Sequence, residues 1–255
     1  MKKRSPLKDK PLRTPGQSLD EKLDDVLYDN ALAPMMLAGV LIILACLEWV
    51  KSIYSLPPAP KLYTVLAAGG LLYTGVRIYL IWPRLQALKQ GRNGERAVGQ
   101  FLERLRTRDY IVFHDVVGKD FNIDHVLIGP AGVFTIETKT YSKKSGPDEK
   151  VRFDGVVLTV DGLKLDRDPV VQGKSQANWL RHLLEESTGR KLLTKPVVLF
   201  PGWFVEQSPG STRDIWVLEP KALPAFLENE PACLSPEDVK LASFHLSRYI
   251  RTQGA

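Results

Sequence analysis

Residues 122–139 read NIDHVLIGPAGVFTIETK, two runs of apolar and β-branched residues on either side of a Gly-Pro-Ala-Gly segment. Such runs are typical of strands, and the Gly and Pro between them indicate a turn, so the segment predicts an antiparallel hairpin. If the turn closes symmetrically, Asp124 lies opposite Glu137. Because side chains alternate along a strand, Lys139 shares the face of Glu137. The sequence therefore predicts a pair of carboxylates and an ammonium group on one face.

A metal ion would explain why these charges meet. Cross-strand Cβ atoms lie about 4.5–5.5 Å apart, and like charges at that distance destabilise a sheet unless something neutralises them. Mg²⁺ is usually held by one or two carboxylates together with waters and phosphate oxygens. The alternative is a solvated hairpin face on which Lys139 pairs with a neighbouring carboxylate. The nearly unbroken apolar runs beside the charges indicate strands buried on both faces, which favours the metal site.

The same residues resemble a known enzyme family. Asp124, followed across the turn by Glu137-Thr138-Lys139, is similar to the core of the PD-(D/E)xK nuclease fold, and residues 91–200 resemble the nuclease-related domain (NERD) family. The resemblance implies a restriction-endonuclease-like α/β fold, in which helices flank a mixed central sheet. It also implies Mg²⁺ or Mn²⁺ as cofactor, held by Asp124, Glu137 and the carbonyl oxygen of Thr138. Lys139 would orient the attacking water, help to deprotonate it, or pair with the phosphate.

Two more site residues enter through this resemblance. The segment at 91–95, GRNGE, predicts the start of a helix, and its Glu95 matches a Glu that would contribute to the metal site. The alternative is a first-turn Glu that favours the helix dipole. The segment at 169–172, PVVQ, matches a Pro-x-x-Gln element, which would place Gln172 near the scissile phosphate or, alternatively, on a helix surface. The sequence departs from the wider superfamily at Ile123, where Pro is common.

Composition limits the class of protein. The chain has 255 residues, 44% of them hydrophobic, and a formal net charge of +6. It can therefore form a sizeable core, and its charge favours an anionic partner such as nucleic acid or lipid headgroups without choosing between them. The sequence has Cys46 and Cys233 as its only cysteines, so neither a disulfide framework nor a zinc site is indicated and a reducing compartment fits best. No phosphate-binding Gly loop, nucleophile elbow or internal repeat is present.

Two long apolar runs precede the hairpin. Residues 31–50 are nearly free of charge until Glu48, and residues 62–82 carry Arg77 as their only charge. About 20 apolar residues span the hydrocarbon core of a bilayer, so we expect two transmembrane helices joined by a Pro-rich loop. The alternative is a pair of buried core helices in a soluble protein. Runs this long that are apolar on all sides favour the membrane.

The flanks of the runs predict their orientation. The N-terminal tail and the segment after Trp82 carry more Lys and Arg than the loop between the runs, which places both termini in the cytoplasm. Residues 1–17 are basic and without periodicity, and predict a disordered tail. Residues 18–27 predict a short amphipathic helix, either on a membrane surface or as an ordinary surface helix. We expect a multi-pass protein with two spans in a bacterial inner membrane.

Local patterns predict the remaining elements. Residues 110–117 predict a strand, and Asp-Gly pairs at 154–155 and 161–162 predict tight turns in a small meander. Asp168 followed by Pro169 is typical of a helix N-terminus. Buried strands and a final helix complete the chain, with strands expected at 195–200 and 215–218 and the helix capped at Ser235.

Other polar residues near the hairpin have less specific roles. His114 and His125 are expected to be packed or hydrogen-bonded rather than to act as bases, since a metal-activated water can serve as the nucleophile. His125 should point to the face opposite Asp124. The polar loop at 141–150 either contacts a phosphate backbone or is solvated.

The predicted organisation has three parts: residues 1–29 form the tail and the short helix, residues 30–83 the transmembrane hairpin, and residues 91–255 the nuclease-related domain with a C-terminal extension. The predicted function is a membrane-anchored, metal-dependent nuclease that hydrolyses phosphodiester bonds of DNA, or of RNA, on the cytoplasmic side. The alternative is a catalytically inactive module that binds nucleic acid or protein at the membrane. A transporter is disfavoured, because two helices provide no inverted repeat and no polar pore lining.

Overall fold

The computed structural model describes residues 11–54, 59–143, 150–165, 167–208 and 214–253. The chain forms two compact units: Leu19–Lys89, called the helical unit below, and Met1–Ser18 together with Gln90–Ala255, called the sheet unit. Several predicted features lie outside the described residues, namely the start of the basic tail, much of the Pro-rich loop and residues 144–149 of the basic loop.

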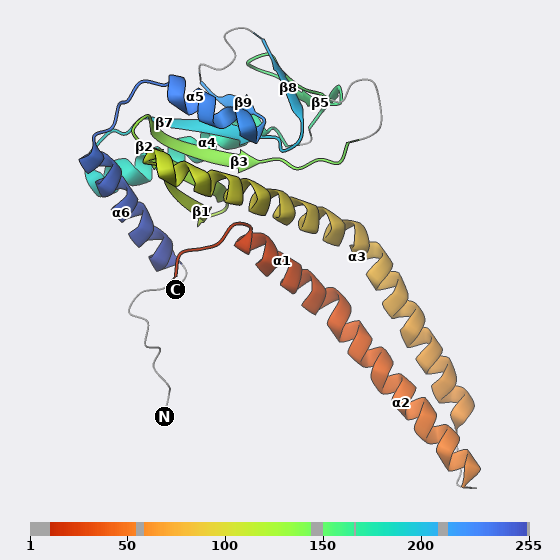
Figure 1. Cartoon of the computed structure of the whole chain (residues 1–255). Coiled ribbons are helices and arrows are strands. Elements are labelled where there is room, and N and C mark those ends of the chain that lie inside the picture. The colour runs from red at the N-terminus through yellow and green to blue at the C-terminus, as the bar shows by residue number, and fades with distance from the viewer. Residues whose placement is uncertain (1–10, 55–58, 144–149, 166, 209–213, 254–255) are drawn as a thin grey trace, which may run out of the picture. The chain divides into compact units, whose positions relative to one another are not determined.

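The sheet unit is built on a five-stranded mixed sheet with the strand order β1-β2-β3-β7-β9 (Figure 1). Its strands are β1 (Ile111–Val117), β2 (Asn122–Gly129), β3 (Gly132–Thr138), β7 (Thr194–Leu199) and β9 (Trp216–Leu218). β1, β2 and β3 are antiparallel, whereas β7 and β9 continue the sheet in parallel with β3. The prediction of a mixed central sheet is confirmed.

The hairpin of β2 and β3 has the predicted register. Ile128 pairs with Val133, and the turn consists of residues 130–131. All residues of β3 and all but the first of β2 are buried. The charges on this hairpin therefore lie in the interior of the sheet and not on a solvated face.

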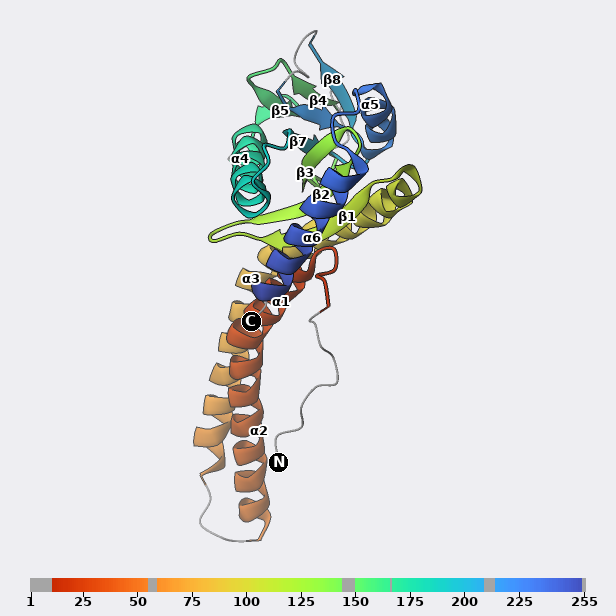
Figure 2. The ribbon, with the colours of Figure 1, turned by 90° about the vertical axis from the view of Figure 1, so that its left-hand side faces the viewer.

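Helices cover both faces of this sheet (Figures 1 and 2). They are the end of α3 (Pro60–Leu102), α4 (Pro169–Thr188), α5 (Leu223–Asn229) and α6 (Pro236–Gln253). On one face, Leu127 belongs to a buried cluster with Leu102 of α3 and Leu223 of α5. On the other face, Val126 is buried with Leu180 of α4 and side chains of α6.

Helices α4 and α6 begin as predicted. The Asp168 side chain accepts a hydrogen bond of 2.8 Å from the backbone N–H of Val170, and α4 ends before Gly189, whose φ is +70°. The Ser235 hydroxyl accepts a hydrogen bond of 3.2 Å from the N–H of Asp238 at the start of α6. These caps satisfy backbone groups that a helix end leaves without partners.

A second sheet, called the small sheet below, has the strand order β6-β5-β4-β8. Its strands are β4 (Lys150–Phe153), β5 (Leu158–Val160), β6 (Leu163–Lys164) and β8 (Phe204–Gln207). Asp161 and Gly162 both have positive φ, as the predicted two-residue turn requires. The other Asp-Gly pair lies in a four-residue loop, because the Asp154 carboxylate accepts hydrogen bonds from the N–H groups of Val156 and Val157. This turn is wider than predicted, and β8 and α5 were not predicted at all.

The helical unit contains two long helices. One is continuous from α1 (Gln17–Leu27) through a π-helical turn, η1 (Tyr28–Leu32), to α2 (Ala33–Ile53), and the other is α3. Both are long and apolar enough to cross a membrane.

Small residues separate these two helices. A Cβ atom on Gly70 would lie 2.8 Å from the Leu41 side chain and 3.6 Å from the Cα atom of Ala38, so the helices approach closely there. Ala38 and Ala67 are buried, whereas many large apolar side chains are more than half exposed. Examples of the exposed side chains are Met36, Ile43, Leu72 and Leu80.

The apolar face of α1 is covered within the helical unit. Leu23 and Val26 are buried together with Leu85 of α3. The structure therefore shows α1 packed against α3, an arrangement that neither of the two predictions for this helix included.

The prediction of a helix start at residues 91–95 is wrong. Helix α3 is continuous through this segment and accommodates Pro83 in its interior. A Cβ atom on Gly94 would lie 1.8 Å from the Thr140 hydroxyl oxygen. The glycine therefore permits close approach of a neighbouring segment, and this is why it resembles a helix-start signal without being one.

The prediction of a disordered tail at residues 1–17 is wrong from residue 11 onward. The Arg13 guanidinium donates a hydrogen bond of 2.6 Å to the Asp115 carboxylate in β1. The backbone N–H and the hydroxyl of Ser18 donate to the same oxygen at 2.9 Å. This basic residue therefore fixes the segment to the sheet unit through an ion pair that no local sequence pattern reveals.

Candidate active site

Asp124 and Glu137 occupy equivalent positions on the two strands of the hairpin. His125 pairs with Ile136, so the next positions in the same register are those of the two acidic residues, as predicted. Asp124 is 9% exposed and Glu137 is 5% exposed. Because side chains alternate along each strand, both carboxylates point to the face that α4 covers.

The Asp124 carboxylate is fixed by the neighbouring strand. Its Oδ2 atom accepts a hydrogen bond of 2.7 Å from the backbone N–H of Thr138. Burial raises the pKa of Asp124 well above its ordinary value, and the negative charges of Glu137 and Glu95 raise it further. Both effects favour the protonated, neutral form of Asp124 when no cation is bound.

Lys139 joins the carboxylate pair to α4. Its Nζ atom donates to Glu137 Oε1 at 2.7 Å and to Gln172 Oε1 at 3.0 Å. The structure therefore brings Gln172, which could have been an ordinary surface residue, into direct contact with the predicted lysine. Glu137, Lys139 and Gln172 form one hydrogen-bonded chain.

Lys139 is a firmly protonated cation in this arrangement. Burial disfavours its ammonium group, but the charge of Glu137 and the hydrogen bond to it outweigh this effect, so the pKa of Lys139 is raised. The ion pair with Glu137 therefore favours the ammonium form of Lys139 over the neutral amine.

Gln176 is a site residue that the sequence did not single out. Its Nε2 atom donates to Glu137 Oε2 at 2.7 Å and to the carbonyl oxygen of Asn122 at 2.8 Å. The side chain is 2% exposed, and it lies one helical turn after Gln172 on α4. Both oxygens of Glu137 are thus oriented, one by Lys139 and the other by Gln176. The signal available in the sequence was the spacing of four residues between two glutamines on a helix.

Glu95 approaches the site from the end of α3. It is half-buried, and its charge is close enough to raise the pKa of Asp124. Because α3 does not begin near residue 91, the alternative role of Glu95 as a first-turn residue is excluded. In the described part of the chain, no group of three or more Asp, Glu, His or Cys side chains is placed to hold a metal ion.

The donor set nevertheless suits a hard cation that keeps part of its hydration shell. Mg²⁺ takes oxygen ligands and is commonly held by one or two carboxylates plus waters and phosphate oxygens. Each oxygen of Glu137 accepts one hydrogen bond and retains a further lone pair. Burial and the nearby charges of Glu137 and Glu95, which together raise the pKa of Asp124, are a second reason why a cation fits here.

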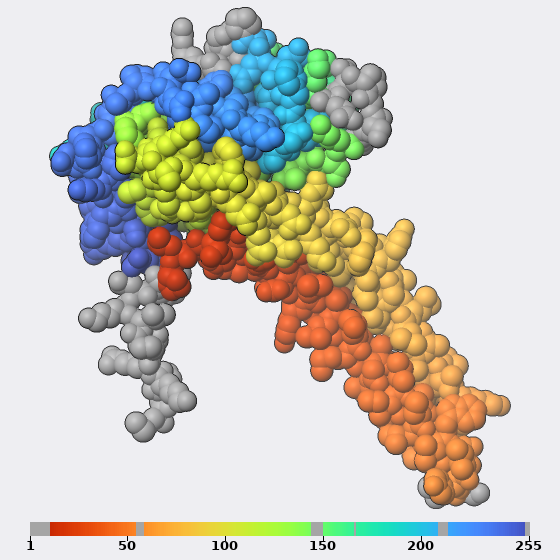
Figure 3. All heavy atoms as spheres, in the orientation of Figure 1, coloured from red at the N-terminus to blue at the C-terminus, as the bar shows by residue number. Residues whose placement is uncertain are grey.

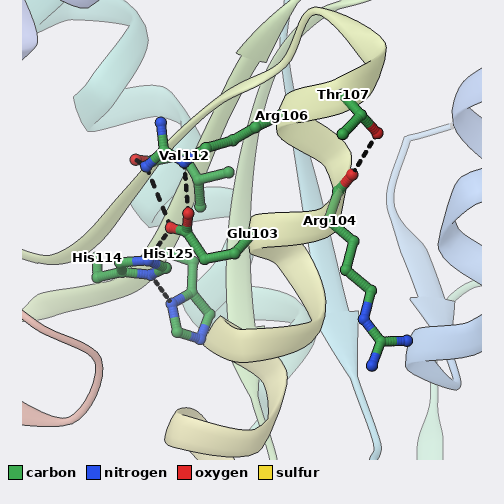
Figure 4. A network of polar contacts seen from close by, with 7 residues as sticks. All are labelled: Glu103, Arg104, Arg106, Thr107, Val112, His114 and His125. Atoms are coloured by element: carbon green, nitrogen blue, oxygen red, sulfur yellow. Dashed lines mark hydrogen bonds and ion pairs between the residues drawn. The ribbon is translucent and has the colours of Figure 1, made fainter.

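The two predicted histidines lie in a separate hydrogen-bonded network (Figure 4). The Nδ1 atoms of His114 and His125 are 2.9 Å apart, and His114 Nε2 is 2.8 Å from Glu103 Oε1. Burial, together with the charge of His114, lowers the pKa of His125 well below its ordinary value. The expectation that both histidines are hydrogen-bonded is confirmed. Glu103 is the first residue of the 3₁₀ helix η2 (Glu103–Arg108), which follows α3. It lies on the face opposite Asp124, so neither histidine belongs to the carboxylate site.

Three comparisons relate the chain to known proteins. The family model described as nuclease-related domain matches residues 90–201. An uncharacterized protein of Bacillus anthracis, pXO1-01, is 39% identical over 57 residues, which are 20% of this chain and 27% of that protein, so the match covers about a quarter of this relative's length. The crystal structure of protein VC1899 from Vibrio cholerae aligns with 94% of this chain and 58% of its own, with 12% identity and a TM-score of 0.21, which is too low to inform the fold.

Proposed function

Residues 90–201 are a nuclease-related domain, which belongs to the PD-(D/E)xK-like nuclease superfamily, and we propose that the chain is a metal-dependent nuclease. It hydrolyses phosphodiester bonds of DNA, or of RNA, on the cytoplasmic side of a membrane. Residues 30–83 anchor it there as a two-helix hairpin, residues 1–29 precede the anchor, and residues 91–255 form the catalytic domain with its C-terminal extension.

One observation carries the proposal. The buried carboxylates of Asp124 and Glu137 point to one face of the sheet, and the Lys139 ammonium lies 2.7 Å from Glu137 on that same face. Burying a charge is costly unless it is paired or coordinates a metal ion. One lysine cannot neutralise two carboxylates, and a divalent cation supplies the missing charge.

The residues have distinct roles in this proposal. Asp124, Glu137 and the carbonyl oxygen of Thr138 hold Mg²⁺ or Mn²⁺. When bound there, the ion acidifies a water nucleophile and stabilises negative charge on the phosphate. The hydrogen bond from the Thr138 N–H to Asp124 supports the assignment, because it fixes the orientation of one ligand before any ion binds.

Lys139 acts as a cation rather than as a base. Its raised pKa keeps the ammonium protonated at neutral pH, so it donates hydrogen bonds to the attacking water or to a phosphate oxygen. Gln172 holds the lysine on this face through its bond of 3.0 Å and presents its amide group to the substrate. Glu95 adds negative charge that strengthens binding of the ion.

The exposed apolar surface of the helical unit supports the membrane anchor. In each of its long helices only 17% of the most apolar stretch is buried, whereas a core helix of a soluble protein buries most of its apolar residues. Helix α2 has 21 residues and is therefore about 30 Å long, which matches the hydrocarbon thickness of a bilayer. Small residues between the helices, such as Gly70 and Ala38, are typical of helix pairs packed in lipid.

Cleavage by the full-length protein in detergent micelles tests the catalytic proposal. We would incubate it with supercoiled plasmid and with single-stranded DNA and RNA in Mg²⁺ or Mn²⁺, and compare Glu137→Gln and Lys139→Ala variants. We expect a loss of at least about 100-fold in rate for each, because each removes charge stabilisation at the phosphate. Lys195 and Glu230 form a matched control pair, 2.6 Å apart at the other end of the sheet, and Lys195→Ala should leave cleavage unchanged.

Two outcomes would overturn the proposal. Cleavage that survives both Glu137→Gln and Lys139→Ala would show that the activity comes from elsewhere. Nucleic-acid binding in EDTA without cleavage in any metal would instead support the alternative of a non-catalytic binding module at the membrane.

A further inference from the structure

We propose that the exposed face of the small sheet binds a single-stranded stretch of the nucleic acid that the site cleaves. The choice of nucleic acid as the ligand rests on the proposed function. The surface itself follows from the register of the strands. The surface consists of side chains from all four strands, namely Lys150, Arg152, Thr159, Lys164, Phe204 and Glu206.

Strand register places these side chains on one face. Arg152 of β4 pairs with Thr159 of β5 and with Glu206 of β8, and Thr159 pairs in turn with Lys164 of β6. Residues that pair directly across strands point to the same side of a sheet. The alternate residues of β4, Val151 and Phe153, are buried, so the opposite face is the one that packs on the core.

An aromatic ring with a cation beside it is the main feature of this surface. Phe204 is 64% exposed, and the Lys150 Nζ atom lies 6.0 Å from the centre of its ring. Nucleic-acid bases stack on exposed aromatic side chains, and neighbouring cations contact the phosphates that connect them. In a duplex the bases are already stacked on one another, so this arrangement suits a single strand.

This surface carries more positive than negative side chains, but two of its cations, Arg152 and Lys150, are paired with Glu206. Arg152 Nε lies 3.1 Å from Glu206 Oε2, and Lys150 Nζ lies 3.9 Å from the same oxygen. One carboxylate therefore serves two cations, and a phosphate group would compete with it for both. A hollow of about 490 Å³ beside them, lined in part by Arg152, Thr159 and Glu206, leaves room for a ligand.

One hydrogen bond joins the start of β8 to the segment that follows the candidate active site. Trp203, the residue before Phe204, donates a hydrogen bond of 3.3 Å from its indole Nε1 to the carbonyl oxygen of Tyr141, two residues beyond Lys139. The Lys143 ammonium lies 5.4 Å from the Trp203 ring centre. Figure 1 shows β5 and β8 on the side to which the arrow of β3 points, and the atoms of the β8 segment lie at the surface in Figure 3. The segment after Lys139 therefore lies next to the residue that precedes Phe204.

Fluorescence anisotropy in EDTA tests the inference without relying on catalysis. The full-length protein in detergent would be titrated into a labelled single-stranded oligonucleotide and into the matching duplex, with Phe204→Ala and Phe204→Trp variants. We expect Phe204→Ala to weaken single-strand binding about tenfold, Phe204→Trp to retain it, and duplex binding to change little. Phe244→Ala, which removes a ring that is 62% exposed on α6, is the matched control and should bind like wild type.

A second variant changes binding in the opposite direction. Glu206→Gln removes the negative charge that lies 3.1 Å from Arg152 and 3.9 Å from Lys150, so it should tighten single-strand binding and steepen its dependence on salt concentration. Undetectable binding to wild type, or equal binding to Phe204→Ala, Glu206→Gln and wild type, would overturn the inference. If binding does not depend on Phe204 but cleavage still depends on Glu137, the binding surface is wrong and the proposed nuclease activity stands. If binding depends on Phe204 but no cleavage occurs, the binding surface stands and the proposed nuclease activity is wrong.

Discussion

Asp124 makes the folded protein sensitive to pH when no metal is bound. Its pKa is raised well above 3.8 by burial and by Glu137, so the folded state holds this proton over a range where the unfolded state has lost it. The proton on Asp124 stabilises the folded state fully below pH 3.8, and this stabilisation is lost as the pH rises through the pKa that Asp124 has in the folded state. A pKa difference of one between the two states corresponds to about 1.4 kcal/mol.

Replacing this carboxylate should therefore stabilise the metal-free protein. In EDTA, Asp124→Asn should melt at a higher temperature than wild type at pH 7–8, with a difference that shrinks toward pH 4, although the variant no longer cleaves. Thermal unfolding followed by tryptophan fluorescence at several pH values measures this. Parallel melting curves for the two proteins across the pH range would contradict the raised pKa.

Gln176 should act through Glu137 and not on the substrate. If the hydrogen bond of 2.7 Å from Gln176 to Glu137 Oε2 is lost, the amide of Gln176 no longer holds the Glu137 carboxylate in its orientation. Removing a residue that orients a metal ligand typically costs about 10–100-fold in metal affinity or activity. We expect Gln176→Ala to raise the Mn²⁺ concentration needed for half-maximal cleavage, with little change in KM for the oligonucleotide. An unchanged metal dependence would show that Gln176 is only a packing residue.

Strand pairing fixes local geometry, so the residue pattern alone placed three site residues, whereas Gln172 and Glu95 were added through the family resemblance. Asp124, Glu137 and Lys139 follow from the two-residue period and one turn. Gln176 was not singled out, because its role depends on how α4 is rotated relative to the sheet, which no local pattern reports. The charge of Glu95 raises the pKa of Asp124, although the helix that carries Glu95 was assigned the wrong start.

At the scale of elements, we expect that α3 can pass close to the segment after β3 because residue 94 is a glycine. A methyl group there would clash with Thr140, so Gly94→Ala should destabilise the protein by about 1–3 kcal/mol. Adding Thr140→Ala should recover part of this loss. Gly75→Ala in the same helix is the control, since no atom beyond its chain neighbours and the adjacent backbone of its own helix lies within 4 Å of the new methyl group. Equal melting temperatures for Gly94→Ala and Gly75→Ala would contradict the proposed close approach.

Periodicity located most helices and strands but not all of their ends. The Asp168-Pro169 and Ser235 signals placed two helix starts correctly, because a cap is a local hydrogen bond. The segment GRNGE was misread, since its glycines serve a tertiary contact and not a helix start. β8 is an edge strand of the small sheet and has four residues, which are too few for a clear alternating pattern.

At the scale of the whole molecule, membrane attachment should depend on the helical hairpin. The full-length protein should remain in the membrane pellet after extraction with alkaline carbonate. Deleting residues 31–82, which removes the exposed apolar side chains, should release it into the supernatant. Release of the intact protein by carbonate would contradict the transmembrane assignment and leave a peripheral or soluble protein.

Contacts between distant segments were the part of the molecule that the sequence could not supply. Arg13 and Asp115 are 102 residues apart, and nothing near Arg13 distinguishes it from the other basic residues of a tail. The mixed sheet was expected through the family resemblance, whereas the ordering of residues 11–18 against β1 required the structure.

The most direct test of the metal site is a titration of Mn²⁺ followed by electron paramagnetic resonance. The free ion gives a strong signal that is lost on binding, so the number of sites and their affinity can be read for wild type, Asp124→Asn and Glu137→Gln. We predict one site or two adjacent sites in wild type, and affinity reduced at least about tenfold in both variants. Wild-type protein that binds no Mn²⁺, or variants that bind it as tightly as wild type, would contradict the assignment of these carboxylates.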